Sequence, residues 1–342
     1  FMKRYGYDPS IYRTESIVDL VKQHRNGGDI FPESIDVVVG GFPCQDFSVA
    51  GKRKGFNSMR THDGKLRADD LPTEETRGKL YYWMKEVIDI TKPKIFIAEN
   101  VKGLVNMGQV KDIIQADFSQ ADGNGYIVLS PQVLHAGNYG VPESRERVIF
   151  IGIRKDALKE EIAQILKNDL IPNHLNPYPQ PTHNCTLNDE TLATPVVLCD
   201  VLKQLKEPKE SFDPSQRFYS KAKYMGAHCQ GQKEITMNSI GPTIRSEHHG
   251  NIEYRRLSLE HGGTNKNELE KGLAERRLTP RECALIQTFP PDFQFVIPKD
   301  YDWKRFIVSA SGAYKVIGNA VPPILAYHIA MRIQNLWSTY FK

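Results

Sequence analysis

The sequence predicts an α/β protein built on a mostly parallel sheet, with a smaller, irregular, β-rich region after it. Three short apolar runs rich in β-branched residues are typical of buried strands, at residues 35–40, 94–98 and 148–153. Segments with apolar residues at helical spacing lie between them. Alternating strands and helices form βαβ units, and the carboxyl ends of such strands are where we expect functional side chains.

Each helix is predicted from its own pattern. Residues 78–90 and 110–118 carry apolar residues at helical spacing, and residues 157–170 form a charged helix. From about residue 186 to residue 274 no helical period is evident, and residues 234–237 and 242–245 are strand-like. A helix returns at residue 279, where Thr279 and Glu282 form a capping box, and the last helix begins at Pro323.

Composition excludes several classes of protein. The chain has 342 residues, of which 40% are apolar and 25% are charged, so collagen and disordered chains are excluded. Its five cysteines are scattered and form no Cys-x-x-Cys pair, so we expect no metal site and no disulfide framework. No apolar run reaches the roughly 18–20 residues of a membrane helix, and no signal peptide is evident. A reducing, cytoplasmic compartment follows as the expectation.

Three segments carry residues suited to chemistry. Cys44 follows the first predicted strand, where a thiol can serve as a nucleophile if it is exposed and its pKa is lowered. Glu99 directly follows the second apolar strand and suits proton transfer. Arg145 and Arg147 stand two apart at the start of the third, so we expect their guanidinium groups to share one face.

Together these segments resemble the DNA cytosine-5 methyltransferases of bacterial restriction–modification systems. Pro43-Cys44-Gln45 is similar to the family's nucleophile motif, Glu99-Asn100-Val101 to its carboxylate motif, and Arg145-x-Arg147 to its Gln-x-Arg-x-Arg motif, with Glu143 in place of Gln. Three further segments match in the family's order: Arg77–Leu80, Arg277–Ala284 and Gly318–Pro322. The resemblance therefore covers the chain from Gly40 onwards and implies a Rossmann-like, S-adenosylmethionine-dependent methyltransferase sheet.

The resemblance implies covalent catalysis on a flipped-out cytosine. The Cys44 thiolate would attack carbon 6, and Glu99 would contact ring nitrogen 3. Arg147, with Arg145 beside it, would orient the base oxygen and the carboxylate. Carbon 5 would then take the methyl group of S-adenosylmethionine, after which proton loss and elimination of Cys44 would complete the cycle. The base must leave the stack, at a cost of roughly a few kcal/mol.

The net charge of +4 is concentrated beside the predicted nucleophile. Residues 51–67 hold six basic side chains and one acidic one, a net charge of +5, which suits contact with a phosphate backbone. We therefore expect duplex DNA to be contacted here by Gln45, Ser48, Lys52, Arg53 and Lys54.

The resemblance also implies a division into domains. Residues 1–155 would form the catalytic and cofactor domain, 156–275 a target-recognition domain, and 276–342 a returning segment that completes the first. In the recognition domain, Pro242-Thr243-Ile244 resembles the family's Thr-Leu element. Arginine and asparagine side chains can read guanine and adenine edges, and Gln230 could fill the space left by the flipped base. We expect DNA contacts from Gln230, Thr243, Arg245, His248, His249, Asn251 and Arg255.

The cofactor side of the family pattern is incomplete. Its first motif, Phe-x-Gly-x-Gly, is not found, and no acidic ribose-binding residue is identifiable before Asp8. The first βα unit is therefore expected to be absent, because the chain is a fragment, a second polypeptide supplies the unit, or the protein is inactive; the start at Phe1 favours a fragment. Two segments are candidates for contact with the adenine of the cofactor, Ser16-Ile17 and Gly28-Asp29-Ile30. We favour Ser16 and Ile17. The remaining expected cofactor positions are Pro43, Leu80, Asn319 and Ala320.

Three functions follow as alternatives. The favoured one is a DNA cytosine-5 methyltransferase, acting as a monomer on the nucleoid of a bacterium. The second is methylation of transfer RNA, against which the large predicted recognition domain argues. The third is a non-catalytic DNA-binding fragment or subunit, motivated by the missing first motif.

Overall fold

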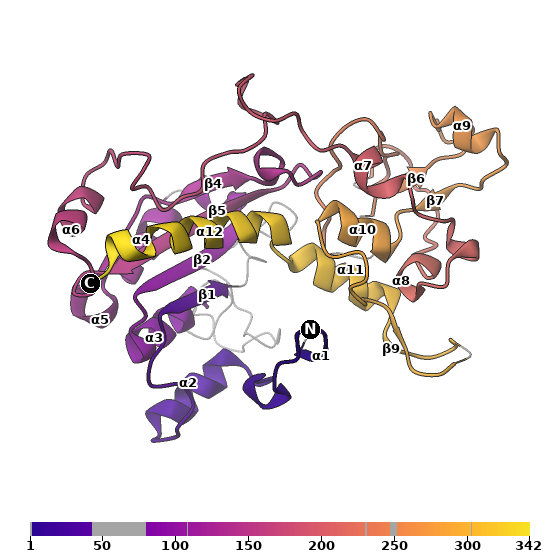
Figure 1. Ribbon diagram of the computed structural model, residues 1–342. Coiled ribbons are helices and arrows are strands. Elements are labelled where there is room, and N and C mark those ends of the chain that lie inside the picture. Colours follow the sequence, from indigo (N-terminus) through magenta and orange to yellow (C-terminus); the bar gives the residue numbers. More distant parts are fainter. Residues whose placement is uncertain (1, 43–79, 108, 230, 247–251, 302) are drawn as a thin grey trace. The chain divides into compact units, whose positions relative to one another are not determined.

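The computed structural model describes the whole chain except residues 1, 43–79, 108, 230, 247–251 and 302 (Figure 1). It divides into two compact units. Unit 1 comprises Phe1–Val133, Arg147–Asn176 and Leu336–Lys342, and unit 2 comprises Leu134–Glu146 and Pro177–Asn335. The chain thus passes between the units several times, and each unit is described by itself below.

Unit 1 is built on a mixed sheet with the strand order β1-β2-β5-β3, in which β4 also pairs with β5. β1 and β2 are parallel, with Gly41 opposite Glu99, whereas β5 runs antiparallel to both β2 and β3. The elements are α1 (Met2–Tyr5), a 3-10 turn (Pro9–Ile11), α2 (Ile17–Arg25), β1 (Val37–Gly41), α3 (Tyr81–Thr91), β2 (Ile95–Val101), a 3-10 turn (Lys102–Asn106), α4 (Val110–Ser119), α5 (Ala121–Asn124), β3 (Tyr126–Val128), β4 (Gln132–His135), β5 (Glu146–Arg154) and α6 (Glu160–Leu166).

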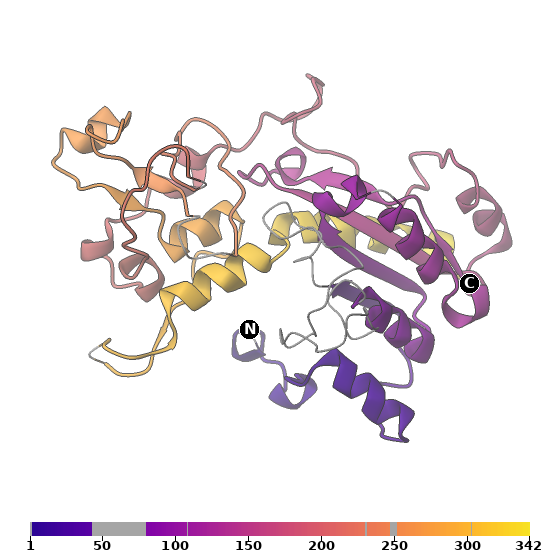
Figure 2. The same cartoon turned by 180° about the vertical axis from the view of Figure 1, so that it is seen from behind.

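Apolar side chains on one face of this sheet explain its helices. Phe96 on β2 and Phe150 on β5 are fully buried and share a cluster with Ile88 of α3 and with Ile114 and Phe118 of α4. The two helices accordingly cover that face, as the view from behind also shows (Figure 2). The alternation of strand and helix thereby produces the layered α/β core expected from the sequence.

The direction of β5 corrects one expectation. Residues 148–153 were expected to run parallel to the other strands, but β5 is antiparallel. Its registers with both neighbours show this, since Glu99 of β2 is opposite Ile149 and Ile127 of β3 is opposite Ile153 in antiparallel ladders. The sheet is therefore mixed rather than mostly parallel.

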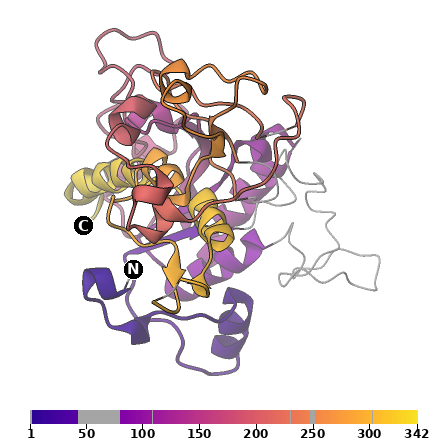
Figure 3. The same ribbon diagram turned by 90° about the vertical axis from the view of Figure 1, so that its right-hand side faces the viewer.

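Unit 2 is irregular, as expected (Figure 3), but in the part described the short strands β6–β9 are accompanied by helices α7–α12, so it is not β-rich. Its core includes Leu198, Ile244, Leu278, Ile286 and Ile317, all buried. Residues 234–237 contain only an isolated bridge at Glu234 and a turn at Met237, and residues 242–245 form no regular secondary structure, instead of the expected strands. The elements are α7 (Leu198–Leu202), a 3-10 turn (Pro208–Glu210), α8 (Pro214–Arg217), β6 (Tyr254–Arg256), α9 (Lys266–Leu269), β7 (Arg276–Arg277), α10 (Pro280–Ile286), β8 (Ile297–Pro298), β9 (Phe306–Val308), α11 (Ala310–Asn319) and α12 (Pro323–Tyr340), which continues into unit 1.

Two predicted helix starts are confirmed in this part of the chain. Thr279 accepts the amide of Glu282, whose side chain in turn accepts the amide of Thr279, so the capping box is complete at the start of α10. Pro323 is the first residue of α12, where its missing N–H costs no hydrogen bond.

Candidate active site

The parallel pairing of β1 and β2 places Gly41 beside Glu99 at the carboxyl ends of both strands. A Cβ at Gly41 would lie 3.1 Å from Oε2 of Glu99, so a larger residue there would crowd the carboxylate. Asn100 is buried, and its side-chain amide donates to the carbonyl of Phe42 at 3.2 Å. These contacts hold the end of β1, which is where the segment containing Cys44 begins in the sequence.

Glu99 and Arg147 form an ion pair at this end of the sheet. Glu99 is opposite Ile149 on β5, so Arg147 is its diagonal neighbour on the same face. Nε of Arg147 lies 2.7 Å from Oε1 of Glu99, and the two side chains are only 11% and 16% exposed. Because the carboxyl group of Glu99 is largely shielded from solvent and held by a guanidinium group, its orientation is fixed. A fixed orientation suits hydrogen bonding to a planar ring.

Arg145 differs from the expectation that it works beside Arg147. Its side chain is fully buried, and its guanidinium donates to the carbonyls of Ile244, Gly318 and Ala320 at 2.7–2.8 Å. Those bonds occupy the fork of Arg145 within unit 2, whereas Arg147 faces Glu99 in unit 1. Arg145 precedes the first residue of β5, so the alternation that would give both arginines one face does not extend to it.

The described cofactor-side positions have different environments. Ser16 caps α2 by accepting the amide of Val18, and the side chain of the next residue, Ile17, is 41% exposed. Leu80 is buried against Val18 and Trp83. Asn319 is the exposed last residue of α11, and Ala320 after it is half-buried. The competing segment Gly28-Asp29-Ile30 follows α2, with Asp29 exposed and Ile30 half-buried.

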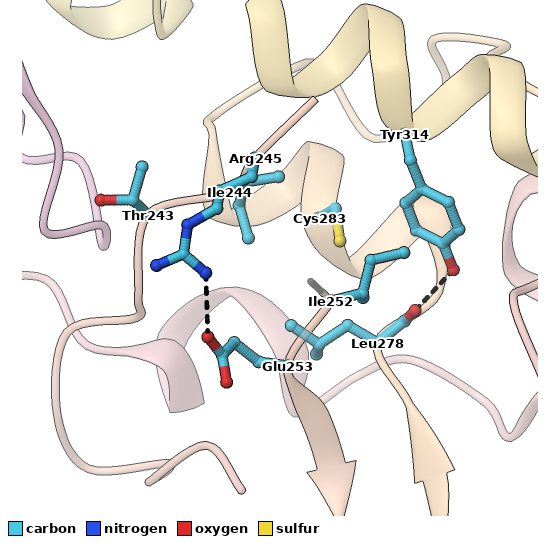
Figure 4. Close-up of a pocket in the computed structure, with 8 residues that line it drawn as sticks. All are labelled: Thr243, Ile244, Arg245, Ile252, Glu253, Leu278, Cys283 and Tyr314. Carbon is cyan, nitrogen blue, oxygen red and sulfur yellow. Dashed lines mark hydrogen bonds and ion pairs between the residues drawn. The ribbon is translucent and has the colours of Figure 1, made fainter. Parts of the chain in front are cut away.

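Two of the expected DNA-side residues lie beside a small pocket in unit 2 (Figure 4). Thr243 is half-buried, and its hydroxyl donates to the carbonyl of Ser144. Arg245 points across the pocket to Glu253, with Nη1 at 3.6 Å from the carboxylate. Burial raises the pKa of Glu253, although the Lys233 amide and the charge of Arg245 act in the opposite direction. The pocket lining is completed by Ile244, Ile252, Leu278, Cys283 and Tyr314.

Arg255 does not face solvent, in contrast to the expectation that it contacts DNA. It is 8% exposed, and its guanidinium lies 2.6 Å from Glu268. Burial acts to raise the pKa of Glu268, but the hydrogen bonds and charges of Arg255 and Arg256 outweigh it and lower that pKa. Arg255 thus belongs to the internal ion-pair network of unit 2.

Several expected site residues lie outside the described residues. They are Pro43, Cys44, Gln45, Ser48, Lys52, Arg53 and Lys54, which follow β1 in the sequence, and Gln230, His248, His249 and Asn251.

Sequence reasoning overlooked three residues that support the site. They are Asn100, which holds Phe42, Gly41 beside Glu99, and Glu143, whose carboxylate lies 3.3 Å from Arg145. All three belong to segments already singled out, so the sequence marked their places but not their contacts. Among the described residues no group of three or more His, Cys, Asp or Glu side chains is arranged to hold a metal ion. None of the described helices is long and apolar enough to span a bilayer.

Comparison with known proteins connects these features to one family. Residues 10–335 match the model of the C-5 cytosine-specific DNA methylases. The chain is 30% identical to the type II methyltransferase M.FnuDI of Fusobacterium nucleatum, over 96% of this chain and 86% of the relative. It is also 30% identical to M.HpaII of Haemophilus parainfluenzae, over 86% and 71% of the two chains.

The fold agrees with a solved structure of low sequence identity. The Dnmt2 methyltransferase of S. pombe superposes with a TM-score of 0.54 at 15% identity, covering 96% of this chain and 84% of that one. The nucleophile, carboxylate and arginine segments all fall inside the residues that match the family model. The chain therefore belongs to the C-5 cytosine-specific DNA methylases, enzymes that transfer the methyl group of S-adenosylmethionine to carbon 5 of cytosine in DNA.

Proposed function

We propose that Glu99 and Arg147 hold the cytosine ring of a flipped-out base while Cys44 attacks its carbon 6. The observation that carries this proposal is the buried Glu99–Arg147 ion pair at the carboxyl ends of β1 and β2. Cys44 follows the last residue of β1 by three positions in the sequence. A thiolate nucleophile and a positioned carboxylate are the two groups that this chemistry requires from the protein.

Each residue has a defined task in the proposed reaction. The Sγ of Cys44 forms a bond to carbon 6, which turns the aromatic ring into an enamine that is nucleophilic at carbon 5. Glu99, in its protonated form, donates its O–H to ring nitrogen 3 and so stabilises the negative charge that develops there when the thiolate adds. Arg147 fixes the carboxylate and donates to the base oxygen. Carbon 5 would take its methyl group from S-adenosylmethionine, which would leave as S-adenosylhomocysteine. Transfer of the carbon-5 proton to water would then expel the Cys44 thiolate.

The cofactor positions are part of the same proposal. S-adenosylmethionine presents an adenine ring, ribose hydroxyls and an amino-acid end. The exposed apolar side chain of Ile17 suits an adenine face, and the exposed amide of Asn319 suits a polar group. Ser16 and Leu80 support this side indirectly, because the hydroxyl of Ser16 caps α2 and Leu80 packs beneath that helix. Pro43 and Ala320 complete the set by motif.

DNA contacts are proposed on both sides of the target base. The basic segment 51–67, with Gln45, Ser48, Lys52, Arg53 and Lys54, would follow the phosphate backbone. Arg245 is 28% exposed and loosely paired at 3.6 Å, so it can exchange Glu253 for a base edge. In unit 2, Gln230, Thr243, His248 and Asn251 would join it as the target-recognition surface.

The edge of the sheet supports a proposal about the missing motif. Within the part of the chain that the structure describes, β1 pairs only with β2, and Val39 on β1 is 70% exposed. The unpaired backbone groups of an edge strand are a template for a further strand, and the exposed Val39 leaves apolar surface on the adjoining face for the segment that follows it. We propose that such a strand, from outside the described residues or from a second polypeptide, supplies the Gly-rich cofactor turn.

The biological setting follows from the curated relatives. Both relatives are named type II methyltransferases of bacteria. We propose that this enzyme is likewise the modification partner of a restriction system, that it acts as a monomer, and that it works on DNA in the bacterial nucleoid.

Trapping of the covalent intermediate tests the proposal. The enzyme is incubated with S-adenosylmethionine and a duplex carrying 5-fluorocytosine, because fluorine at carbon 5 blocks the final elimination. We expect an adduct that survives denaturation with the native enzyme and with a Cys199→Ser control, and none with Cys44→Ser. Absence of an adduct from the native enzyme, under conditions where it methylates the unmodified duplex, would contradict the role of Cys44.

A further inference from the structure

Three segments that are far apart in the sequence meet inside unit 2. They are residues 142–144 just before β5, residues 241–245 and residues 318–320 at the end of α11. The first two run side by side, since the amide of Ser144 donates to the carbonyl of Gly241 and the amide of Gly241 donates to that of Pro142, both at 2.8 Å. The hydroxyl of Thr243 adds a bond to the carbonyl of Ser144.

Two fully buried charged side chains connect these segments. Oε1 of Glu143 accepts the amide of Ile244 at 2.6 Å and lies 3.3 Å from Nη1 of Arg145. Nη1 of Arg145 also donates to the carbonyl of Ile244 at 2.8 Å. Its Nη2 donates to the carbonyls of Gly318 and Ala320, each at 2.7 Å. The pair therefore binds the backbone of residue 244 from two directions and the end of α11 from a third.

Gly318 shows how closely the second and third segments approach. A Cβ at this position would collide with the backbone of Arg245 and Ser246. Only glycine permits this contact between two backbones. The backbone of Gly318 therefore packs directly against the backbone of Arg245 and Ser246.

We propose that Glu143 and Arg145 are a positioning pair that couples DNA binding by the Thr243–Arg245 segment to cofactor binding by the Asn319–Ala320 segment. This inference rests on the proposed function, which assigns those two segments to DNA and to S-adenosylmethionine. Each ligand fixes one segment, and the buried pair transmits that constraint to the other. Such coupling is reciprocal, so each ligand changes the affinity for the other by the same factor.

The chemistry of Glu143 and Arg145 suits the transmission of position between the two segments better than a merely structural attachment of one segment to the other. An arginine fork can bond three carbonyls at fixed angles, which a lysine ammonium cannot reproduce. Glu143 stands where the family pattern has Gln, so this chain places a carboxyl group instead of an amide beside Arg145, 3.3 Å from Nη1. A charge-assisted contact holds its geometry more tightly than a neutral one. The arrangement transmits position without Arg145 touching the base.

Ligand-binding measurements on the full-length enzyme test the proposal. The affinity for S-adenosylhomocysteine is measured by calorimetry with and without a duplex that carries the methylated sequence, found by bisulfite sequencing of expressing cells. In the native enzyme, we expect the duplex to increase the affinity for S-adenosylhomocysteine, and the ratio of the two affinities is the coupling factor. Arg145→Lys should reduce this coupling factor at least threefold. Glu143→Gln should reduce it in the same direction by less. Arg154→Lys, a solvent-accessible substitution on β5, serves as the control and should leave the factor unchanged.

The outcomes separate this proposal from the one on which it rests. If Arg145→Lys keeps the native coupling factor and only its kcat falls, then Arg145 does not have the positioning role that we propose. If Arg145→Lys does not fold, Gly318→Ala tests the same junction, because its Cβ pushes the two segments apart while Arg145 stays intact. Arg245→Ala tests the DNA assignment itself, because an unchanged affinity for the duplex in that variant contradicts the proposed recognition surface. If Arg245→Ala binds the duplex more weakly but Arg145→Lys keeps the native coupling factor, only the coupling is contradicted.

Discussion

Nε of Arg147 lies 2.7 Å from Oε1 of Glu99, across the antiparallel pair formed by β2 and β5. The relationship depends on strand direction, because the antiparallel register puts Arg147 diagonally opposite Glu99 on one face. Both side chains are nearly buried, so the pair is weakly screened by solvent. Its geometry is therefore available to orient a base before the reaction begins.

Loss of this geometry is expected to slow catalysis more than binding. Arg147→Lys keeps the charge but removes the planar fork, and Glu99→Gln keeps the shape but removes the acidic proton. We expect each to lower kcat by about 10²-fold, the size typical of losing one group that stabilises developing charge. Single-turnover methylation of duplex DNA measures this. A change in KM for DNA with native kcat would contradict the proposed roles.

The carboxylate can also be displaced without changing it. A Cβ at Gly41 would lie 3.1 Å from Oε2 of Glu99, so Gly41→Ala should shift the carboxylate by a few tenths of an ångström. We expect kcat to fall by about 10-fold, because catalysis is sensitive to small misplacements of reacting groups. The urea midpoint should change little, since Gly41 is an exposed strand residue. Native kcat in this variant would show that Glu99 is not held where we propose.

These relationships also show how far the sequence could lead. The strands around Phe96 and Phe150, the helices between them and the capping box of Thr279 were predictable, because each depends on residues close together in the chain. The direction of β5 depends on its pairing with β2 and β3, for which short segments give little signal. The role of Arg145 was also hidden, since its carbonyl partners are 99 to 175 residues away.

Thr279 should contribute measurably to stability. Its hydroxyl accepts the amide of Glu282 and donates to the side chain of Gln216 at 2.6 Å, in a fully buried position. Thr279→Ala removes a helix cap and leaves buried polar groups unpaired, so we expect a loss of about 2 kcal/mol. Ser309→Ala, at the more exposed cap of α11, is the control and should cost about 1 kcal/mol. Equal urea midpoints for the two variants would contradict this account.

The ion pairs of Glu207 should make stability depend on pH. Glu207 lies 2.6 Å from Arg256 and 3.0 Å from Arg276. Burial acts to raise the pKa of Glu207, but the two guanidinium groups outweigh it and lower that pKa to about 2, from an ordinary value of 4.5. Because the pKa is lower in the folded state, the ionised carboxylate stabilises the fold above about pH 4.5. That contribution is lost as the pH falls towards 2.

A pH series on Glu207→Gln measures this contribution. With allowance for solvent screening, we expect the variant to be less stable than the native protein by about 1–2 kcal/mol at pH 7. The difference in the free energy of unfolding should shrink progressively below pH 4.5. In that range Glu207 takes up a proton more readily in the unfolded chain than in the folded one. The exposed Glu210→Gln is the matched control and should track the native protein. If the difference for Glu207→Gln stays constant from pH 7 to pH 3, the two arginines do not stabilise the fold through the charge of Glu207.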